Sequence, residues 1–256
     1  MLSLLRRLLR TLGFDLVRLA RGPQQPPAPS LPPDVSDADR EVIEKIAGHT
    51  MTSVERQMAL IQAVRHLVRC DIPGCFVECG VWRGGSSMAA ALTLAQEGDT
   101  TRELYLFDTF EGMTAPLAVD KGIDGSSAQT LLDQDADRSG TVWAVAGLDD
   151  VRANMLATGY PQELVHYVKG PVESTIPGSA PHGPIALLRL DTDWYESTKH
   201  ELVHLFPLLS EGGVLIIDDY GHWHGARQAV DEYFAGDCRP FYLHRIDYTG
   251  RLLVKK

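Results

Sequence analysis

The sequence has few cysteines, no long apolar run and a shortage of positive charge, and each absence excludes a class of protein. Only four of the 256 residues are cysteine, and no His or Cys pairs stand at zinc-finger spacing, which excludes a zinc-finger module. We therefore expect reduced, partly buried thiols in a cytoplasmic protein. No apolar run approaches the ~20 residues that span a bilayer. A net charge of −10 argues against nucleic-acid binding, which usually needs a basic face.

The composition is that of a globular protein, and the chain is long enough for a full hydrophobic core. Charge is unevenly spread, because residues 1–33 carry a net charge of +4 and the remainder carries −14. In residues 1–21, leucines and arginines alternate at helical spacing, which predicts a basic amphipathic helix. Such a helix can lie on an anionic membrane surface, or pack on its own body or a partner subunit. Residues 22–33 form a proline-rich linker.

From residue 34 to residue 256 the pattern predicts one α/β domain. Two helices come first, one capped by Ser36 and one opened by a capping box of Thr52 and Glu55. Apolar runs and helical segments then alternate, which indicates βαβ units and a mostly parallel, doubly wound, Rossmann-like sheet. The expected strands are 75–79, 104–107, 164–168, 185–190 and 214–217, the expected helices are 86–96, 149–157, 197–209 and 225–235, and an antiparallel hairpin joins 241–245 to 251–254.

A glycine-rich turn, ECGVWRGGS at residues 78–86, follows the first strand. Its spacing excludes a P-loop and weakens a nicotinamide interpretation. Its glycines let the backbone approach a ligand, and the following helix start offers free N–H groups. Glu78 can accept from a positive amino group, and Asp108, at the end of the second strand, can accept both hydroxyls of a ribose. A tight turn with a capping aspartate explains each feature separately, whereas a nucleoside cofactor explains the pair.

Aspartates follow two later strands, Asp191 and Asp193 after the first and Asp218 and Asp219 after the second. If the strands are neighbours, about 4.8 Å apart, Asp191, Asp218 and Asp219 converge where open α/β sheets bind ligands. Three such carboxylates repel one another unless a cation neutralises them, and oxygen-only ligands suit Mg²⁺. The alternative for each aspartate is to cap the next helix, and for Asp193 we prefer that alternative.

Four aromatic or histidine side chains near these aspartates have two interpretations each. His222 and His224 can bind metal, act as a base or contact substrate, although most loop histidines do none of these. Tyr195 and Trp223 either form the wall of a pocket or pack in the core.

Four stretches occur in this order: ECGVWRGG (78–85), DTFEG (108–112), LDTDWYEST (190–198) and IDDY (217–220). Together they closely resemble the macrocin O-methyltransferase (TylF/MycF/NovP) family, whose members methylate sugar hydroxyls on antibiotics. The resemblance covers roughly residues 50–256. It implies a class I methyltransferase that uses S-adenosylmethionine and Mg²⁺, and it suggests a homodimer.

The resemblance also implies roles for single residues. Glu78 and the turn with Gly80, Gly84 and Ser86 would hold the methionine end of the cofactor, and Asp108 would hold its ribose. Asp191, Asp218 and Asp219 would take the metal positions, with Asp191 also the general base. Residues 113–148 would be the family's variable lid, and their lack of obvious structure suits a lid that orders on binding. Thr192 and Trp194 stand where the family often has Gly and Leu, which alters the rim of the acceptor site.

The sequence therefore predicts O-methylation of a sugar, a glycosylated metabolite or a glycan in the cytoplasm, with peripheral membrane contact available to the N-terminal helix. Three alternatives stay open. A catechol-type methyltransferase would use similar carboxylates on a flat phenolic substrate. A nicotinamide-dependent oxidoreductase would share the fold. A non-catalytic binding module would be expected to lack the carboxylates that are present here.

Overall fold

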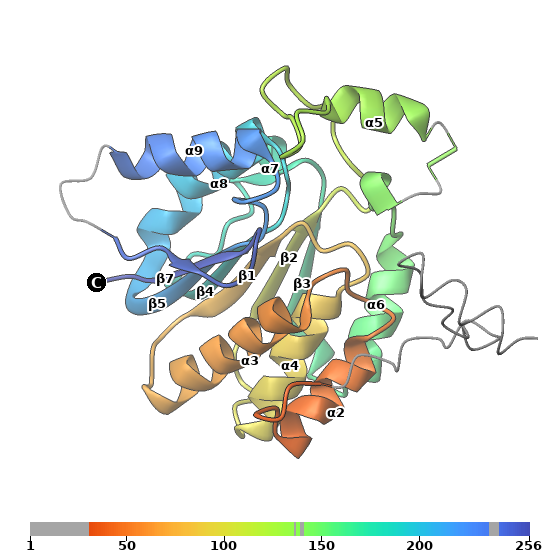
Figure 1. Cartoon of the computed structure of the whole chain (residues 1–256). Helices are drawn as coiled ribbons and strands as arrows, with labels where there is room; N and C mark the ends of the chain where they lie inside the picture. Colours follow the sequence, from red (N-terminus) through yellow and green to blue (C-terminus); the bar gives the residue numbers. More distant parts are fainter. Residues whose placement is uncertain (1–30, 136, 139–140, 236–240) are drawn as a thin grey trace, which may run out of the picture. The chain divides into compact units, whose positions relative to one another are not determined.

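The computed structural model describes residues 31–135, 137–138, 141–235 and 241–256 (Figure 1). The chain divides into two units, Met1–Asp34 and Val35–Lys256. The predicted N-terminal helix and nearly all of the proline-rich linker lie outside the described residues. None of the described helices is both long and apolar enough to cross a membrane.

The second unit is built on a seven-stranded sheet in the order β3-β2-β1-β4-β5-β7-β6 (Figure 1). Strands β1 to β5 are parallel, and β7 and β6 add an antiparallel edge. The strands are β1 (Cys75–Cys79), β2 (Leu104–Asp108), β3 (Val165–Lys169), β4 (Ile185–Leu190), β5 (Leu209–Ile217), β6 (His244–Arg245) and β7 (Arg251–Val254). The predicted α/β, Rossmann-like fold with a C-terminal antiparallel hairpin is confirmed. The strand order reverses between β1 and β4, which is where open α/β sheets bind ligands.

Helices cover both faces of this sheet, α2, α3, α4 and α6 on one side and α7, α8 and α9 on the other (Figure 1). Most of them begin and end close to the predicted bounds, although α8 stops at Leu205, where a 3₁₀ turn containing Pro207 leads into β5. The helices are α2 (Asp37–Ile46), α3 (Val54–Arg69), α4 (Gly85–Gln96), α5 (Ala128–Gln134), α6 (Leu148–Ala157), α7 (Val172–Thr175), α8 (Tyr195–Leu205) and α9 (His224–Ala235).

The two N-terminal helix starts test the capping predictions. Ser36 caps α2, because its hydroxyl accepts a hydrogen bond from the Asp39 N–H, as predicted. The cap of α3 is Ser53, whose Oγ accepts from the Arg56 N–H at 3.2 Å. The capping box expected at Thr52 and Glu55 is therefore wrong by one residue. The Thr52 hydroxyl instead pairs with that of Thr50 at 2.8 Å, which removes it from the helix end.

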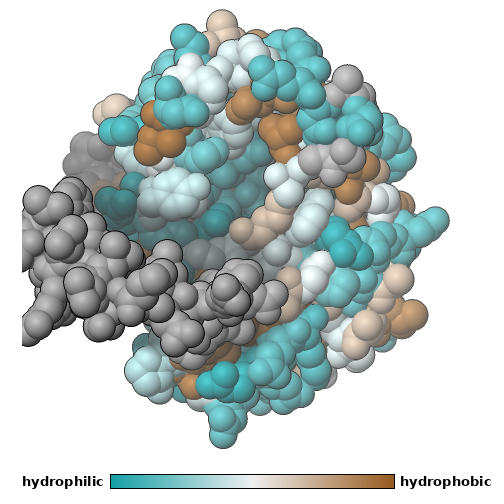
Figure 2. Space-filling model, turned by 45° about the vertical axis from the view of Figure 1, so that its right-hand side comes forward, coloured by the Kyte–Doolittle hydropathy of each residue, from teal (hydrophilic) through white to brown (hydrophobic). Residues whose placement is uncertain are grey.

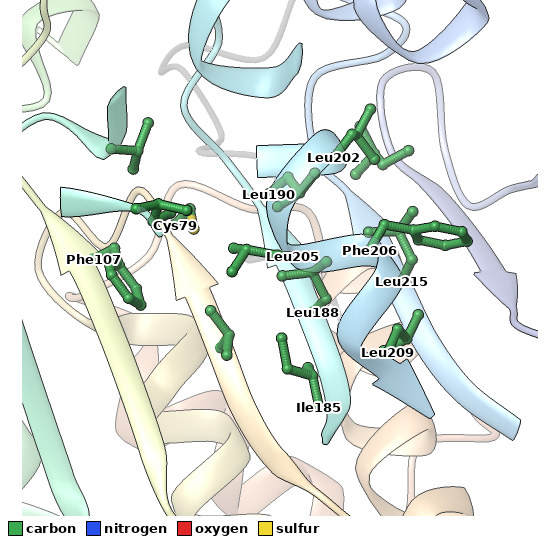
Figure 3. Packing of buried hydrophobic residues seen from close by; sticks show 14 of the residues in the cluster. Cys79, Phe107, Ile185, Leu188, Leu190, Leu202, Leu205, Phe206, Leu209 and Leu215 are labelled. Atoms are coloured by element: carbon green, nitrogen blue, oxygen red, sulfur yellow. The ribbon is translucent and has the colours of Figure 1, made fainter. Parts of the chain in front are cut away.

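The core lies between the central strands and α8. Every residue of β1 and β4 is buried, as expected for strands covered on both faces. Leu188 of β4 packs in the same cluster as Leu202 and Leu205 of α8 (Figure 3). The rigid sheet fixes the positions at which the carboxyl ends of β1, β2, β4 and β5 deliver their side chains.

The segment predicted to be a lid, residues 113–148, has more structure than the sequence suggests. It contains α5 and a 3₁₀ turn at Thr141–Trp143. Ala128 and Leu132 of α5 are buried in an apolar cluster with Trp194, Trp223 and Ala226. The segment predicted to be a lid therefore packs on the rest of the domain through a small apolar cluster that both parts share.

Candidate active site

A cavity of about 510 Å³ lies at the carboxyl ends of β1, β2, β4 and β5. Its lining comes from the turn after β1, the loop after β2, the lid, and the acidic loops after β4 and β5. Figure 2 shows a hydrophilic hollow in one face of the molecule. The cavity thus lies where the strand order of the sheet reverses, between β1 and β4. The glycine-rich turn and the strand-end aspartates were both expected at this edge of the sheet.

Glycine residues determine the backbone path of the glycine-rich turn, residues 80–85. Gly80 has φ +81°, and a Cβ on it would lie 1.9 Å from the carbonyl oxygen of Asp191. Only glycine permits this approach of the turn to the acidic loop. Gly84, with φ +88°, caps α4 but lies outside the lining that the described residues form, whereas Gly80 and Ser86 line the cavity. Gly84 therefore shapes the turn, and its contact with a cofactor stays a prediction.

Asp108 lines the cavity, and its carboxylate is also tied to the turn. Oδ2 accepts hydrogen bonds from the N–H groups of Val81 at 2.6 Å and Trp82 at 3.1 Å, and Oδ1 accepts from the Phe110 N–H at 2.6 Å. Burial raises the pKa of Asp108, although these three hydrogen bonds oppose the shift. Asp108 thus joins two loops of the site, which its strand-end position did not reveal. Its contact with a ribose stays a prediction.

Glu78 is placed differently from the prediction. It is only 6% exposed and does not line the cavity formed by the described residues. Its Oε1 accepts from Nη1 of Arg189 at 2.7 Å, and its Oε2 accepts from the hydroxyl of Ser87 on α4. Burial raises the pKa of Glu78 to about 7. Strand alternation turns this side chain toward α4, and its expected contact with the amino group of a cofactor stays a prediction.

Arg189 links three strand ends and was not predicted from the sequence. Its buried guanidinium donates to Glu78 on β1, to Asp191 Oδ2 at 2.7 Å and to Asp218 Oδ1 at 2.6 Å. Asp218 is also paired with Arg56 of α3. Burial raises the pKa of Asp218 to about 6, although both guanidinium groups oppose the shift. The signal in the sequence was one arginine inside the apolar run of β4.

The acidic group of the structure consists of Asp191, Asp193 and Asp219. Each offers one carboxylate oxygen, and the three oxygens lie within 4.8 Å of one another. Asp191 and Asp219 meet as predicted, but Asp193 takes the third place instead of Asp218. The reason is that two guanidinium groups hold Asp218, while a left-handed backbone at Asp193, φ +67°, directs its chain toward the group. The expected cap of α8 by Asp193 is wrong, because the N-cap residue is Trp194.

The acidic group fits a hard divalent cation. Asp219 Oδ2 is buried and has no hydrogen-bond partner among the described residues. Burial raises the pKa of Asp193 to about 7, and burial with the neighbouring carboxylates raises that of Asp219 well above its usual range. Carboxylates this close together repel one another when they are ionised, and a bound divalent cation offsets that repulsion. Mg²⁺ prefers such oxygen ligands. The predicted Mg²⁺ thus suits these residues, with Asp193 in place of Asp218.

The histidines and aromatic residues divide between the cavity and the packing around it. His222 lines the cavity, and its Nδ1 lies 3.3 Å from the Tyr248 hydroxyl. Burial lowers the pKa of His222, which favours the neutral ring. His224 begins α9 and donates its N–H to the Lys121 carbonyl. Trp223 both lines the cavity and packs edge-on against Trp194, with ring centroids 4.9 Å apart.

Comparison with known proteins gives a family and named relatives. The model of the macrocin-O-methyltransferase (TylF) family matches residues 30–255. The chain is 38% identical over 217 residues to a Streptomyces olivaceus enzyme named 8-demethyl-8-(2,3-dimethoxy-alpha-L-rhamnosyl)-tetracenomycin-C 4'-O-methyltransferase, covering 84% of this chain and 79% of that one. It is 34% identical to demethyldecarbamoylnovobiocin O-methyltransferase of Streptomyces niveus, covering 73% and 68%.

Solved structures give the same result for the fold. The structure of the O-methyltransferase NovP superposes with a TM-score of 0.68 at 33% identity, covering 81% of this chain and 82% of that one. The calicheamicin methyltransferase CalS11 superposes with a TM-score of 0.60 at 21% identity, covering 87% and 93%, which shows a shared fold.

Proposed function

The chain belongs to the macrocin O-methyltransferase family and is a methyltransferase, and from this premise we propose that it transfers the methyl group of S-adenosylmethionine to a hydroxyl of a sugar or glycosylated metabolite. The observation that carries the proposal is a single cavity that contains both the glycine-rich turn and the acidic group. Relatives at 32–38% identity are named for methylation of glycosylated antibiotics, which supports a hydroxyl acceptor of this class. An oxidoreductase or a non-catalytic module does not agree with this family.

The glycine-rich turn and the loop after β2 form the proposed cofactor half of the cavity. Gly80 lets the turn approach the Asp191 backbone, and Ser86 lies in the first turn of α4, where N–H groups suit the carboxylate of the methionine end. Asp108 holds this turn and is the proposed partner of the ribose hydroxyls. When bound, S-adenosylmethionine supplies a methyl group that its sulfonium charge already activates.

The acidic group forms the proposed acceptor half. Asp191, Asp193 and Asp219 would hold Mg²⁺, which would supply Lewis-acid stabilisation of the charge that develops on the acceptor hydroxyl. Arg189 holds one oxygen of Asp191 at 2.7 Å, and this fixes the orientation of the carboxylate. Asp191 is the proposed general base, accepting the hydroxyl proton as the new C–O bond forms. The remaining task of the residues is to hold the acceptor oxygen in line with the transferred carbon.

Calorimetric titration with S-adenosylhomocysteine, first in EDTA and then in excess Mg²⁺, tests this proposal. We expect binding in both buffers and an affinity that changes with Mg²⁺, because the Asp191 carbonyl touches the glycine-rich turn. Folded protein that binds in neither buffer would contradict the cofactor assignment. Methylation assays on a panel of glycosides and catechols then separate the sugar acceptor from the catechol-type alternative.

Three further expectations stay predictions of the sequence. They are a homodimer, a cytoplasmic location and peripheral membrane contact through residues 1–21. The helix that would make the membrane contact lies outside the described residues.

A further inference from the structure

Asp120 joins residues 113–134, the first part of the predicted lid and called the lid segment below, to the helix that follows the acidic group. Its side chain is buried, with the residue 1% exposed. Oδ1 accepts the N–H of Tyr195, the first residue of α8, at 2.9 Å, and Oδ2 accepts the N–H of Leu117 at 2.6 Å. Within the described chain, Trp194 gives α8 no side-chain cap. A residue from the lid, 75 positions earlier in the chain, therefore caps this helix.

The space that Asp120 occupies exists because residue 225 is glycine. A Cβ at Gly225, in the first turn of α9, would lie 1.8 Å from Asp120 Oδ1. Two backbone hydrogen bonds hold the chain at residues 120 and 121. The Lys121 carbonyl accepts from the His224 N–H at 2.9 Å, and the Asp120 carbonyl accepts from the Ala128 N–H at 3.0 Å. The carboxylate thus sits where α8, α9 and the lid segment meet.

The lid segment also holds the residue before Tyr195. Trp194 is 2% exposed, and its Nε1 donates to the Thr114 carbonyl at 3.0 Å. Residues 194 and 195 directly follow Asp193, whose φ is +67°. An aspartate in the left-handed region persists only where its surroundings hold the backbone. The two contacts from the lid segment supply that restraint on the C-terminal side of Asp193.

Resting on the proposed function, we infer that Asp120 is a positioning residue for the metal site. By capping α8 it keeps Asp193 in the left-handed conformation that brings its carboxylate to Asp191 and Asp219. The set of three metal ligands is therefore complete only while the lid segment contacts α8. A cation binds strongly only when the lid segment is seated on α8 and α9.

Binding of Mn²⁺ to the full-length protein, followed by electron paramagnetic resonance, measures this effect without an acceptor. We expect Asp120→Ala and Gly225→Ala to weaken Mn²⁺ binding by about tenfold or more, as when the hydrogen-bond partner of a metal ligand is lost. Asp120→Asn keeps one acceptor oxygen and should have an intermediate effect. S-adenosylhomocysteine affinity in EDTA should stay within about twofold, since the glycine-rich turn is unchanged.

Asp133→Ala is the matched control, because Asp133 is an exposed carboxylate of the same lid segment that accepts only a local bond from Gln129. It should bind Mn²⁺ like the unmodified protein. Equal Mn²⁺ affinity in Asp120→Ala, Gly225→Ala and Asp133→Ala would overturn the inference. Loss of S-adenosylhomocysteine binding together with Mn²⁺ binding would also overturn it, by showing a general structural role. Unmodified protein that binds S-adenosylhomocysteine but no Mn²⁺ would instead defeat the metal part of the proposed function.

Discussion

The glycine-rich wall of the cavity, at the ends of β1 and β2, is held by backbone groups, whereas the acidic wall, at the ends of β4 and β5, is held by charged side chains. On the first wall, Asp108 accepts three backbone N–H groups. On the second, Arg189 and Arg56 hold Asp218, and Arg189 holds Asp191. The structure of the glycine-rich wall is therefore sensitive to substitutions that add side-chain volume. The structure of the acidic wall is sensitive to substitutions that remove or add a charge.

The two walls also differ in what their own contacts satisfy. Each carboxylate oxygen of Asp108 accepts at least one hydrogen bond without a ligand, whereas a buried oxygen of Asp219 has no partner among the described residues. An unpaired buried carboxylate destabilises a fold, and such groups persist mainly where function needs them. The acidic wall is thus the part of the site that gives up stability for chemistry.

The largest effect is expected from Asp191→Asn and Asp219→Asn. Either change removes a proposed metal ligand, and the first also removes the general base, so methyl transfer should fall by about 10³-fold. S-adenosylhomocysteine binding in EDTA should change little, because the glycine-rich wall is intact. Asp219→Asn should shift the melting temperature by no more than about 2 °C, since the raised pKa of Asp219 leaves its carboxyl largely protonated and asparagine is also neutral.

Activity assays, calorimetry and thermal melts measure these three quantities on one preparation. Asp124→Asn, on the exposed part of the lid segment, serves as the control for removal of one charge. Activity within a few-fold of the unmodified protein in both active-site variants would remove the acidic group from the mechanism.

Gly80→Ala is expected to break the other wall. Its Cβ would meet the Asp191 carbonyl oxygen at 1.9 Å on a backbone with φ +81°, so the turn must move away from the acidic loop. We expect a loss of ~2–3 kcal/mol in the free energy of unfolding and a clear loss of S-adenosylhomocysteine affinity. Urea unfolding and calorimetry measure the two effects.

Gly98→Ala separates the clash from the backbone strain. Gly98 has nearly the same φ, +80°, but a Cβ there meets nothing within 4 Å. It should lower the free energy of unfolding by about 1 kcal/mol and leave cofactor binding unchanged. Equal losses in the two variants would mean that the approach of Gly80 to Asp191 is unimportant.

The sequence predicted the backbone of this site better than its side chains. Apolar runs located β1 and β4 to the residue, and acids at the ends of two strands brought Asp191 and Asp219 together as expected. These predictions succeed because strand direction and sheet order decide where a strand end lies. Asp193 was missed because a left-handed backbone redirects it, and no local pattern around an aspartate encodes that conformation.

Glu78 and Asp218 share a partner that the sequence did not predict. Both were assigned to ligands from their strand-end positions, and Arg189 reaches across β1, β4 and β5 and pairs with both carboxylates. Arg56, from a helix far away in the sequence, occupies the other side of Asp218. Such ion pairs form because long arginine side chains reach residues on other strands and helices. The sequence pattern of one strand contains no information about them.

Glu78→Gln should give the smallest effect and shows how strongly this buried pairing depends on charge. Burial raises the pKa of Glu78 from an ordinary 4.5 to about 7 in the folded protein. A raised folded pKa contributes stability that is complete below about pH 4.5 and is lost as pH rises through about 7. Glutamine keeps an acceptor for Arg189 but does not titrate, so the variant should lose less stability than the unmodified protein between pH 5 and pH 8. Urea unfolding at these pH values measures the difference. Glu163→Gln, in the exposed part of the 3₁₀ turn at Gln162–Leu164, is the control and should keep the unmodified pH dependence. If Glu78→Gln keeps it too, Glu78 stays ionised across this range and Arg189 fully offsets its burial.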